Sequence, residues 1–161
     1  ALLREKIVRA CARTFVVAVD DSKLAPTLFA GDGSVSKSTK VHSLLPVEVA
    51  PVYAQRTLRA LAALPACVSG GVQPRLRVGA APAGLPGCAL PKGENSAALP
   101  FTTDNGNWVI DLCFARAVED LGALADQIKQ VAGVVEHGLF LDLSSPDAHI
   151  LVGGPDGVFS L

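Results

Sequence analysis

The sequence has no block of like charges and no long uninterrupted apolar run. Its formal net charge is −1, and this balance argues against a nucleic-acid partner or a charged membrane surface. A membrane-spanning helix needs roughly 18 unbroken apolar residues, which no stretch approaches. Half of the 161 residues are hydrophobic, so the chain can form a packed core of one ordinary domain or two small ones.

Closely spaced pairs of cysteine or histidine are also absent. The three histidines are scattered, and none of the four cysteines forms a CxxC pair. We therefore expect neither a zinc site nor a redox pair. The cysteines are expected to be core or loop thiols in a reducing compartment. They are Cys11, Cys67, Cys88 and Cys113.

Methionine is missing, and the sequence opens inside a helical pattern. Apolar side chains between Ala1 and Cys11 share one broad face, and no Ser, Thr, Asp or Asn precedes them as a helix cap. A helix without a cap usually begins earlier in the chain. We therefore expect this sequence to be part of a longer protein that is processed or cleaved.

Two short, unbroken apolar runs lie near the two ends, at residues 15–19 and 149–152. Runs of this length are typical of strands that are buried on both faces of a parallel sheet between helices. Polar residues 20–23 follow the first run, at the position where α/β proteins usually bind ligands. Two strands make a poor sheet, so we expect a missing N-terminal half or a partner chain to cover their faces and edges.

The middle of the chain, residues 46–140, has a separate pattern of alternating strands and helices. It predicts a strand, a helix, two strands, a helix and a strand, which is the βαββαβ or ferredoxin-like arrangement. The step Asn105-Gly106 between two strand-like runs predicts a tight hairpin turn with positive φ angles. The predicted elements are 47–49, 52–64 (ended by Pro65), 75–78, 108–114, 118–131 and 134–140, with loops at 31–43 and 79–99.

Six segments, in this order, resemble the ribose-5-phosphate isomerase A family. Any one alone would be weak, but together they are collinear over nearly the whole chain. The family's inserted ferredoxin-like lid also agrees with the pattern of the middle region. The segments are ALLREK (1–6), DSK (21–23), LPVEV (45–49), TDNGN (103–107), GVVEHGLF (133–140) and DGV (156–158).

The resemblance implies a domain organisation for this α/β chain: the remnant of a Rossmann-like parallel sheet with an inserted ferredoxin-like lid domain. Residues 1–45 would form the C-terminal part of the Rossmann-like catalytic domain. Residues 46–140 would form the lid, and residues 141–161 would return to the Rossmann-like sheet. Fold alone does not give a function, because this arrangement has many unrelated activities.

The resemblance also implies an activity, the aldose–ketose interconversion of ribose 5-phosphate and ribulose 5-phosphate in the pentose phosphate pathway. The reaction passes through an enediolate and needs no metal or organic cofactor. One carboxylate must move a proton between C2 and C1, and the family's base maps to Glu5. A partly dry pocket is expected to raise the pKa of Glu5. The family lysine that contacts the sugar phosphate maps to Lys23.

Other family segments would lie upstream of Ala1. They are a phosphate-binding loop, an aspartate-rich segment and a Lys-Gly-Gly segment, so this chain alone is expected to catalyse little. The alternative is a non-catalytic family remnant that acts as a structural subunit of a larger assembly. A small-molecule regulatory domain has no support beyond architecture. The resemblance further implies a homo-oligomer in the cytoplasm or a plastid.

Four other polar residues receive structural interpretations from the sequence. Asp104 and Asn107 are interpreted as turn residues, because Asp and Asn form local hydrogen bonds in turns. Glu136 and His137 are interpreted as packing or subunit-contact residues on a strand.

Overall fold

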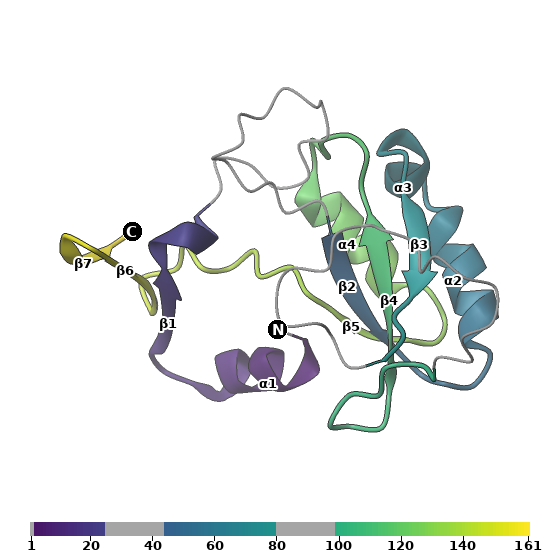
Figure 1. The fold of residues 1–161 in the computed structure, drawn as a ribbon, viewed down its shortest axis with the longest axis horizontal. Helices are drawn as coiled ribbons and strands as arrows, with labels where there is room; N and C mark the ends of the chain where they lie inside the picture. The colour runs from purple at the N-terminus through teal and green to yellow at the C-terminus, as the bar shows by residue number, and fades with distance from the viewer. Residues whose placement is uncertain (1, 25–43, 80–98) are drawn as a thin grey trace.

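The computed structural model describes residues 2–24, 44–79 and 99–161. It is a mixed α/β fold with two sheets, one of which contains a parallel strand pair (Figure 1). The helices are α1 (Leu3–Cys11), η1 (a 3-10 turn, Asp21–Lys23), α2 (Ala54–Ala62), α3 (Pro65–Ser69) and α4 (Leu121–Lys129). The strands are β1 (Phe15–Asp20), β2 (Leu44–Val49), β3 (Gln73–Leu76), β4 (Trp108–Cys113), β5 (Val134–His137), β6 (Ala148–Gly154) and β7 (Gly157–Ser160).

The larger sheet is antiparallel, with strand order β3-β4-β2-β5. Alternate side chains of β2 and β4 point to one face, where they form the main core with α2, α3 and α4. This core is closed to water around Leu61, Leu124 and Ile128. The strands and helices predicted from 46 to 140 are therefore present in the predicted order, with one further helix, α3, that was not predicted. Pro65 was expected only to end a helix, but it is also the first residue of α3. The missing N–H of proline costs nothing at this position, because the first N–H groups of a helix have no partner within it.

The opposite face of β2 and β4 carries polar side chains that are nevertheless buried. Glu48 on β2 is 1% exposed and Asp111 on β4 is 7% exposed. Helix α1 meets this face, because the backbone N–H of Leu3 reaches the Glu48 carboxylate. Buried carboxylates require partners, so the contacts of Glu48 and Asp111 decide what this face of the sheet does.

The smaller sheet has the order β1-β6-β7. Strands β1 and β6 run parallel, with Phe15 opposite Ala148 and Val19 opposite Val152, although the whole larger sheet lies between them in the sequence (Figure 1). The strands expected at 15–19 and 149–152 are confirmed. Their burial on both faces is not: β1 alternates between half-buried and exposed residues, and Val16 is 51% exposed.

The cause of this alternation is the one-sided packing of β1. Phe15 stacks on Phe140 and lies beneath the guanidinium of Arg9 from α1. The alternate side chains of β1 point the other way. Several other large apolar side chains of α1, β6 and β7 are also exposed: Ile7, Val8, Leu151, Val158 and Phe159.

The hairpin predicted around Asn105-Gly106 is present, but its turn differs in type from the prediction. Gly106 donates its N–H to the carbonyl of Thr103, and Thr103 donates to Asn107. Gly106 has φ +76°, whereas Asn105 is not in the left-handed region. This is a type I turn followed by a glycine bulge, so only one residue needs a positive φ.

Two further sequence-based predictions concern membrane spans and thiols. No helix in the portions of the chain that the structure covers is long and apolar enough to cross a membrane.

Cys67 and Cys113 are buried and Cys11 is exposed. Burial raises the pKa of the Cys67 thiol to about 11, as is typical of an inert structural cysteine. Cys88 and the predicted loop at 31–43 lie outside the described residues.

Candidate active site

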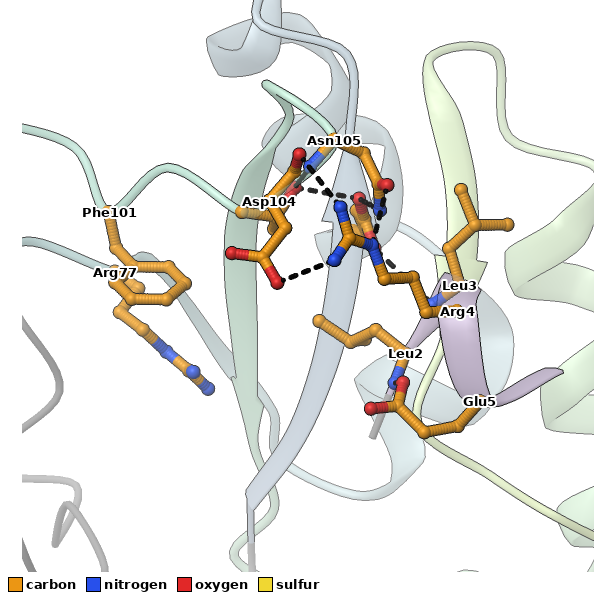
Figure 2. A pocket seen from close by; sticks show the side chains of 10 residues that line it. Leu2, Leu3, Arg4, Glu5, Arg77, Phe101, Asp104 and Asn105 are labelled. Atoms are coloured by element: carbon orange, nitrogen blue, oxygen red, sulfur yellow. Dashed lines mark hydrogen bonds and ion pairs between the residues drawn. The ribbon is translucent and has the colours of Figure 1, made fainter. Parts of the chain in front are cut away.

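Glu5 lies on the first turn of α1 and lines a pocket of about 240 Å³ between this helix and the larger sheet. Figure 2 shows its carboxylate at the pocket beside Leu2, with Arg77 and Phe101 on the other side. The backbone N–H of Leu2 donates to Glu5 Oε2 at 2.8 Å. A carboxylate in the first turn is favoured by the positive end of the helix dipole, so α1 stabilises the ionised form of Glu5.

The expected rise in the pKa of Glu5 is wrong. Hydrogen bonds from the backbone N–H groups of Leu2 and Glu5 lower the pKa of this carboxyl below its usual value, and the positive charge of Arg4 adds to the effect. Burial acts in the opposite direction but does not reverse the result, because Glu5 is exposed. The site therefore contains an ionised carboxylate that can accept a proton at neutral pH.

A second carboxylate, Glu48, lies beneath the same pocket and is nearly closed to water. Its Oε1 accepts three hydrogen bonds from residues 103–107, the TDNGN hairpin. The donors are the Thr103 hydroxyl at 2.9 Å, the Asn105 amide at 3.2 Å and the Asn107 amide at 2.9 Å. Its Oε2 faces the backbone N–H of Leu3 at 3.4 Å.

The pKa of Glu48 has opposing causes. Burial raises it, but the hydrogen bonds from Asn107, Asn105, Thr103 and Leu3 together lower it further, so the net direction is downward. A buried carboxylate with this many donors stays ionised. Glu48 belongs to the LPVEV segment, but no role was predicted for it from the sequence. The only indication in the sequence was a single acidic residue between apolar strand residues.

Arg4 connects the helix to the tip of the TDNGN hairpin. Its guanidinium lies 3.0 Å from the Asp104 carboxylate and also donates to the Asp104 carbonyl and the Asn105 side-chain oxygen (Figure 2). All of these groups are exposed, so the ion pair alone contributes little stability. Its geometric effect is to fix the hairpin against the residue that precedes Glu5.

The far wall of the pocket consists of Arg77 and Phe101. Arg77 makes two hydrogen bonds to the Asp111 carboxylate, one of them at 2.8 Å, and its guanidinium lies 5.5 Å from the centre of the Phe101 ring. This paired arrangement holds a cation at the pocket without leaving a buried charge alone.

Lys6, on the other side of Glu5, faces the edge strand β5. Its ammonium is 3.8 Å from Glu136 and 4.9 Å from the centre of the Phe140 ring. Glu136 also pairs with Lys129 at 3.1 Å. Glu136 and His137 thus serve packing and charge pairing within this chain. Their expected contact with another subunit stays a prediction.

His137 is 5% exposed, and its Nδ1 accepts the backbone N–H of Leu139 at 3.2 Å. Burial, and to a smaller degree the charge of Lys6, lowers its pKa to about 4. The unfolded chain has a histidine pKa near 6.5, so between these values the unfolded state binds the extra proton. Stability is therefore fully present above pH 6.5 and is lost as the pH falls toward 4.

Acidification should consequently destabilise the protein through His137. Each pH unit between the two pKa values is worth about 1.4 kcal/mol, so the loss is at most roughly 3 kcal/mol. Urea unfolding at several pH values should show it, and His137→Gln should flatten the slope between pH 6.5 and 4.5. His149→Gln, at an exposed position, is the control. An unchanged slope in the His137 variant would contradict the assignment.

Lys23 lies elsewhere, in η1 at the carboxyl end of β1, and it is exposed. The pocket lined by Glu5 does not include it. Asp20 caps this turn by accepting the N–H of Ser22 at 2.9 Å, and hydrogen bonds from Ser22 lower the pKa of Asp20. Asp20 and Asp21 line a second, open pocket with Gly153 and Gly154 of β6. Glu5 and Lys23 thus both lie near the ends of elements, and within the described parts of the chain Lys23 lies outside the pocket that Glu5 lines.

Within residues 2–24, 44–79 and 99–161, no three His, Cys, Asp or Glu side chains are grouped so that they could hold a metal ion. The geometry instead combines an ionised carboxylate at a pocket with cations held nearby. A mixed α/β protein with such a site is a candidate for acid–base chemistry.

Comparisons with known proteins agree with this class. The family model of ribose 5-phosphate isomerase A (phosphoriboisomerase A) matches residues 1–157. A probable ribose-5-phosphate isomerase 2 of Arabidopsis thaliana is 35% identical over 159 residues, covering 98% of this chain and 48% of the relative. A ribose-5-phosphate isomerase A of Natronomonas pharaonis is 37% identical over 155 residues, covering 96% and 52%.

Solved structures give the same result. Ribose 5-phosphate isomerase A from Methanocaldococcus jannaschii has a TM-score of 0.65 at 30% identity, covering 98% of this chain and 53% of that one. The enzyme from Plasmodium falciparum has a TM-score of 0.69 at 22% identity, covering 99% and 55%, and shows the fold alone. The chain belongs to the ribose 5-phosphate isomerase A family. It spans about half the length of the relatives it matches.

Proposed function

We propose that this chain takes part in the interconversion of ribose 5-phosphate and ribulose 5-phosphate, with Glu5 as the base. The observation that supports this most is the position of Glu5 on the first turn of α1, at a pocket, in a chain matched by the family model from residue 1 to 157. The reaction needs one carboxylate to take a proton from C2 and return it to C1. The lowered pKa of Glu5 keeps its carboxyl ionised, as a proton acceptor must be.

Lys23 is proposed to contact the sugar-phosphate substrate. Its ammonium is exposed at the carboxyl end of β1, which is the usual place for a ligand in an α/β sheet. Among the described residues, the pocket that Glu5 lines does not include Lys23, so the full substrate site would require the residues that the longer relatives have in addition. The chemistry proposed here uses no metal or organic cofactor.

The finer description of the fold is also a proposal. The order β3-β4-β2-β5, with α2 and α4 on one face, supports a ferredoxin-like lid at 46–140. The parallel pair β1 and β6 supports a Rossmann-like origin for residues 1–45 and 141–161. The exposed apolar side chains of α1, β1 and β7 would then contact a further half of the protein or a partner chain, and the assembly would be a homo-oligomer. The cytoplasm or plastid stays the predicted compartment.

The test is an isomerase assay on the isolated protein together with its intact mass. Formation of ribulose 5-phosphate by this chain within a longer protein or complex would support the proposal. Lack of both turnover and sugar-phosphate binding in that complete form would reject it. The structural-subunit function would then be favoured, with co-purifying partners as its readout.

A further inference from the structure

Glu48 is the most completely buried charged group among the described residues, and the sheet alone does not need it. Its strand neighbours Val47 and Val49 fill the core on the other face. A carboxylate removed from water costs several kcal/mol unless it is well bonded. An apolar side chain at this position would stabilise the sheet without that desolvation cost. The role of the Glu48 charge is therefore inferred from the groups that it contacts.

We propose that Glu48 is a positioning residue that fixes the first turn of α1, and with it the carboxylate of Glu5, against the TDNGN hairpin. The inference rests on the proposed function, in which Glu5 is the base. Glu48 does not touch the substrate in this scheme. It acts through Leu3 and through the hairpin.

The two oxygens of Glu48 serve two different elements. Oε1 takes all three hydrogen bonds from the hairpin, and Oε2 faces the Leu3 N–H two residues before Glu5. A carboxylate is suited to this task because both of its oxygens only accept. The side chain therefore joins the lid sheet to the helix rather than stabilising either one alone.

A second connection reinforces the first. The amide of Asn105 donates from Nδ2 to Glu48 and accepts at Oδ1 from Arg4 Nε at 3.2 Å. Arg4 precedes Glu5 directly, and Lys6, which follows it, is paired with Glu136 on β5. Arg4 is thus held by the TDNGN hairpin, which bonds to Glu48 on β2, and Lys6 is held by Glu136 on β5. Glu48 and Glu136 are opposite each other where these two strands pair.

Such restraint matters because the base must reach two neighbouring carbons. A misplacement of about 1 Å can reduce a rate about a hundredfold. The first turn of a helix otherwise frays, and α1 has no buried residue of its own. The polar contacts with Glu48 and the hairpin therefore supply the order that the packing of α1 does not.

The substitution Glu48→Gln separates the two contacts. A glutamine can still place its oxygen toward the three donors of the hairpin. Its NH₂ group then faces the Leu3 N–H, so a donor meets a donor. The variant should keep the three hydrogen bonds with the TDNGN hairpin and lose the contact with the backbone N–H of Leu3 in α1.

The experiment uses the active protein in its complete form and compares Glu48→Gln with Ile128→Val. Ile128 lies in the core on the other face of the sheet, so its variant lowers stability without touching α1. We expect Glu48→Gln to lower kcat about 10- to 100-fold with KM nearly unchanged. The isotope effect with C2-deuterated ribose 5-phosphate should rise, because proton transfer becomes slower. Ile128→Val should change neither quantity.

Amide hydrogen exchange at Leu3 to Lys6 gives a readout that does not depend on activity. Exchange there should become faster in Glu48→Gln and stay unchanged in Ile128→Val. If the unmodified protein has no isomerase activity but this exchange difference appears, the proposed function fails while the positioning of α1 by Glu48 stands. If kcat, isotope effect and exchange in Glu48→Gln all match those of Ile128→Val, the inference is overturned.

Asn105→Ala provides a second variant in case Glu48→Gln does not fold. Asn105 is exposed, so its loss leaves the core intact while it removes the link between Arg4 and Glu48. A smaller loss of kcat in the same direction is expected. Wild-type kcat together with wild-type exchange at Leu3 to Lys6 in this variant would also overturn the inference.

Discussion

Replacing Glu5 by Gln should lower kcat for the interconversion of ribose 5-phosphate and ribulose 5-phosphate by about 10²- to 10⁴-fold. A positioned general base contributes a factor of this size, and an amide cannot take the proton from C2. KM should change much less, because Glu5 acts on the reacting carbons and its side chain is exposed in the free protein. Steady-state kinetics on the complete protein measure both quantities.

The pH profile and a control variant make this prediction specific. Because the pKa of Glu5 is lowered, the acid limb of kcat/KM should lie below the usual glutamate value of about 4.3. Activity would be lost only as the pH falls through that lowered value. Glu119→Gln changes another exposed glutamate and should leave the kinetics as they are. Equal losses in the two variants, or full activity in Glu5→Gln, would remove Glu5 as the base.

The elements that were predicted best from the sequence are those that a short stretch of residues is enough to define. The strand-like run at 108–114, the helix expected at 118–131 and the Gly106 turn are all visible within short windows, and each has a counterpart in the structure. The core face of the larger sheet follows directly, because strand side chains alternate. The order βαββαβ was therefore accessible from residues 46–140 alone.

Features that depend on pairing register were not predictable in this way. Glu48 interacts with the TDNGN hairpin only because β2 pairs with β4 so that Glu48 is opposite Val109. The sequence of residues 44–49 does not predict that three donors from residues 103–107 will bind the Glu48 carboxylate. The pKa of Glu5 was wrongly expected to rise for a similar reason. Its direction depends on which backbone N–H groups the carboxylate meets, and a motif does not state that.

Gly133→Ala should lower the free energy of unfolding by about 3–4 kcal/mol. Gly133 has φ +93°, where a side chain is strained by about 1–2 kcal/mol. An added Cβ would also lie 2.4 Å from Thr57 Oγ1. Thr57 is buried and donates to the Ala132 carbonyl, so it cannot move without losing that bond, and overpacking adds about 1–3 kcal/mol. Urea unfolding followed by circular dichroism measures the change.

Two further variants separate strain from steric overlap. Gly106→Ala has a similar φ of +76° but no atom within 4 Å of the new Cβ, so it should cost only about 1–2 kcal/mol. Adding Thr57→Ala to Gly133→Ala should recover part of the loss, because the overlapping hydroxyl is gone, and the double-mutant cycle should show a coupling above about 0.5 kcal/mol. Equal costs at Gly106 and Gly133, with no coupling to Thr57, would mean that backbone strain alone governs both positions.

Coupling, in contrast, would show that the close approach of α2 to the turn before β5 is what requires glycine at 133. That turn also accepts the Ala50 N–H at the end of β2, so the same glycine supports the strand that presents Glu48 to α1.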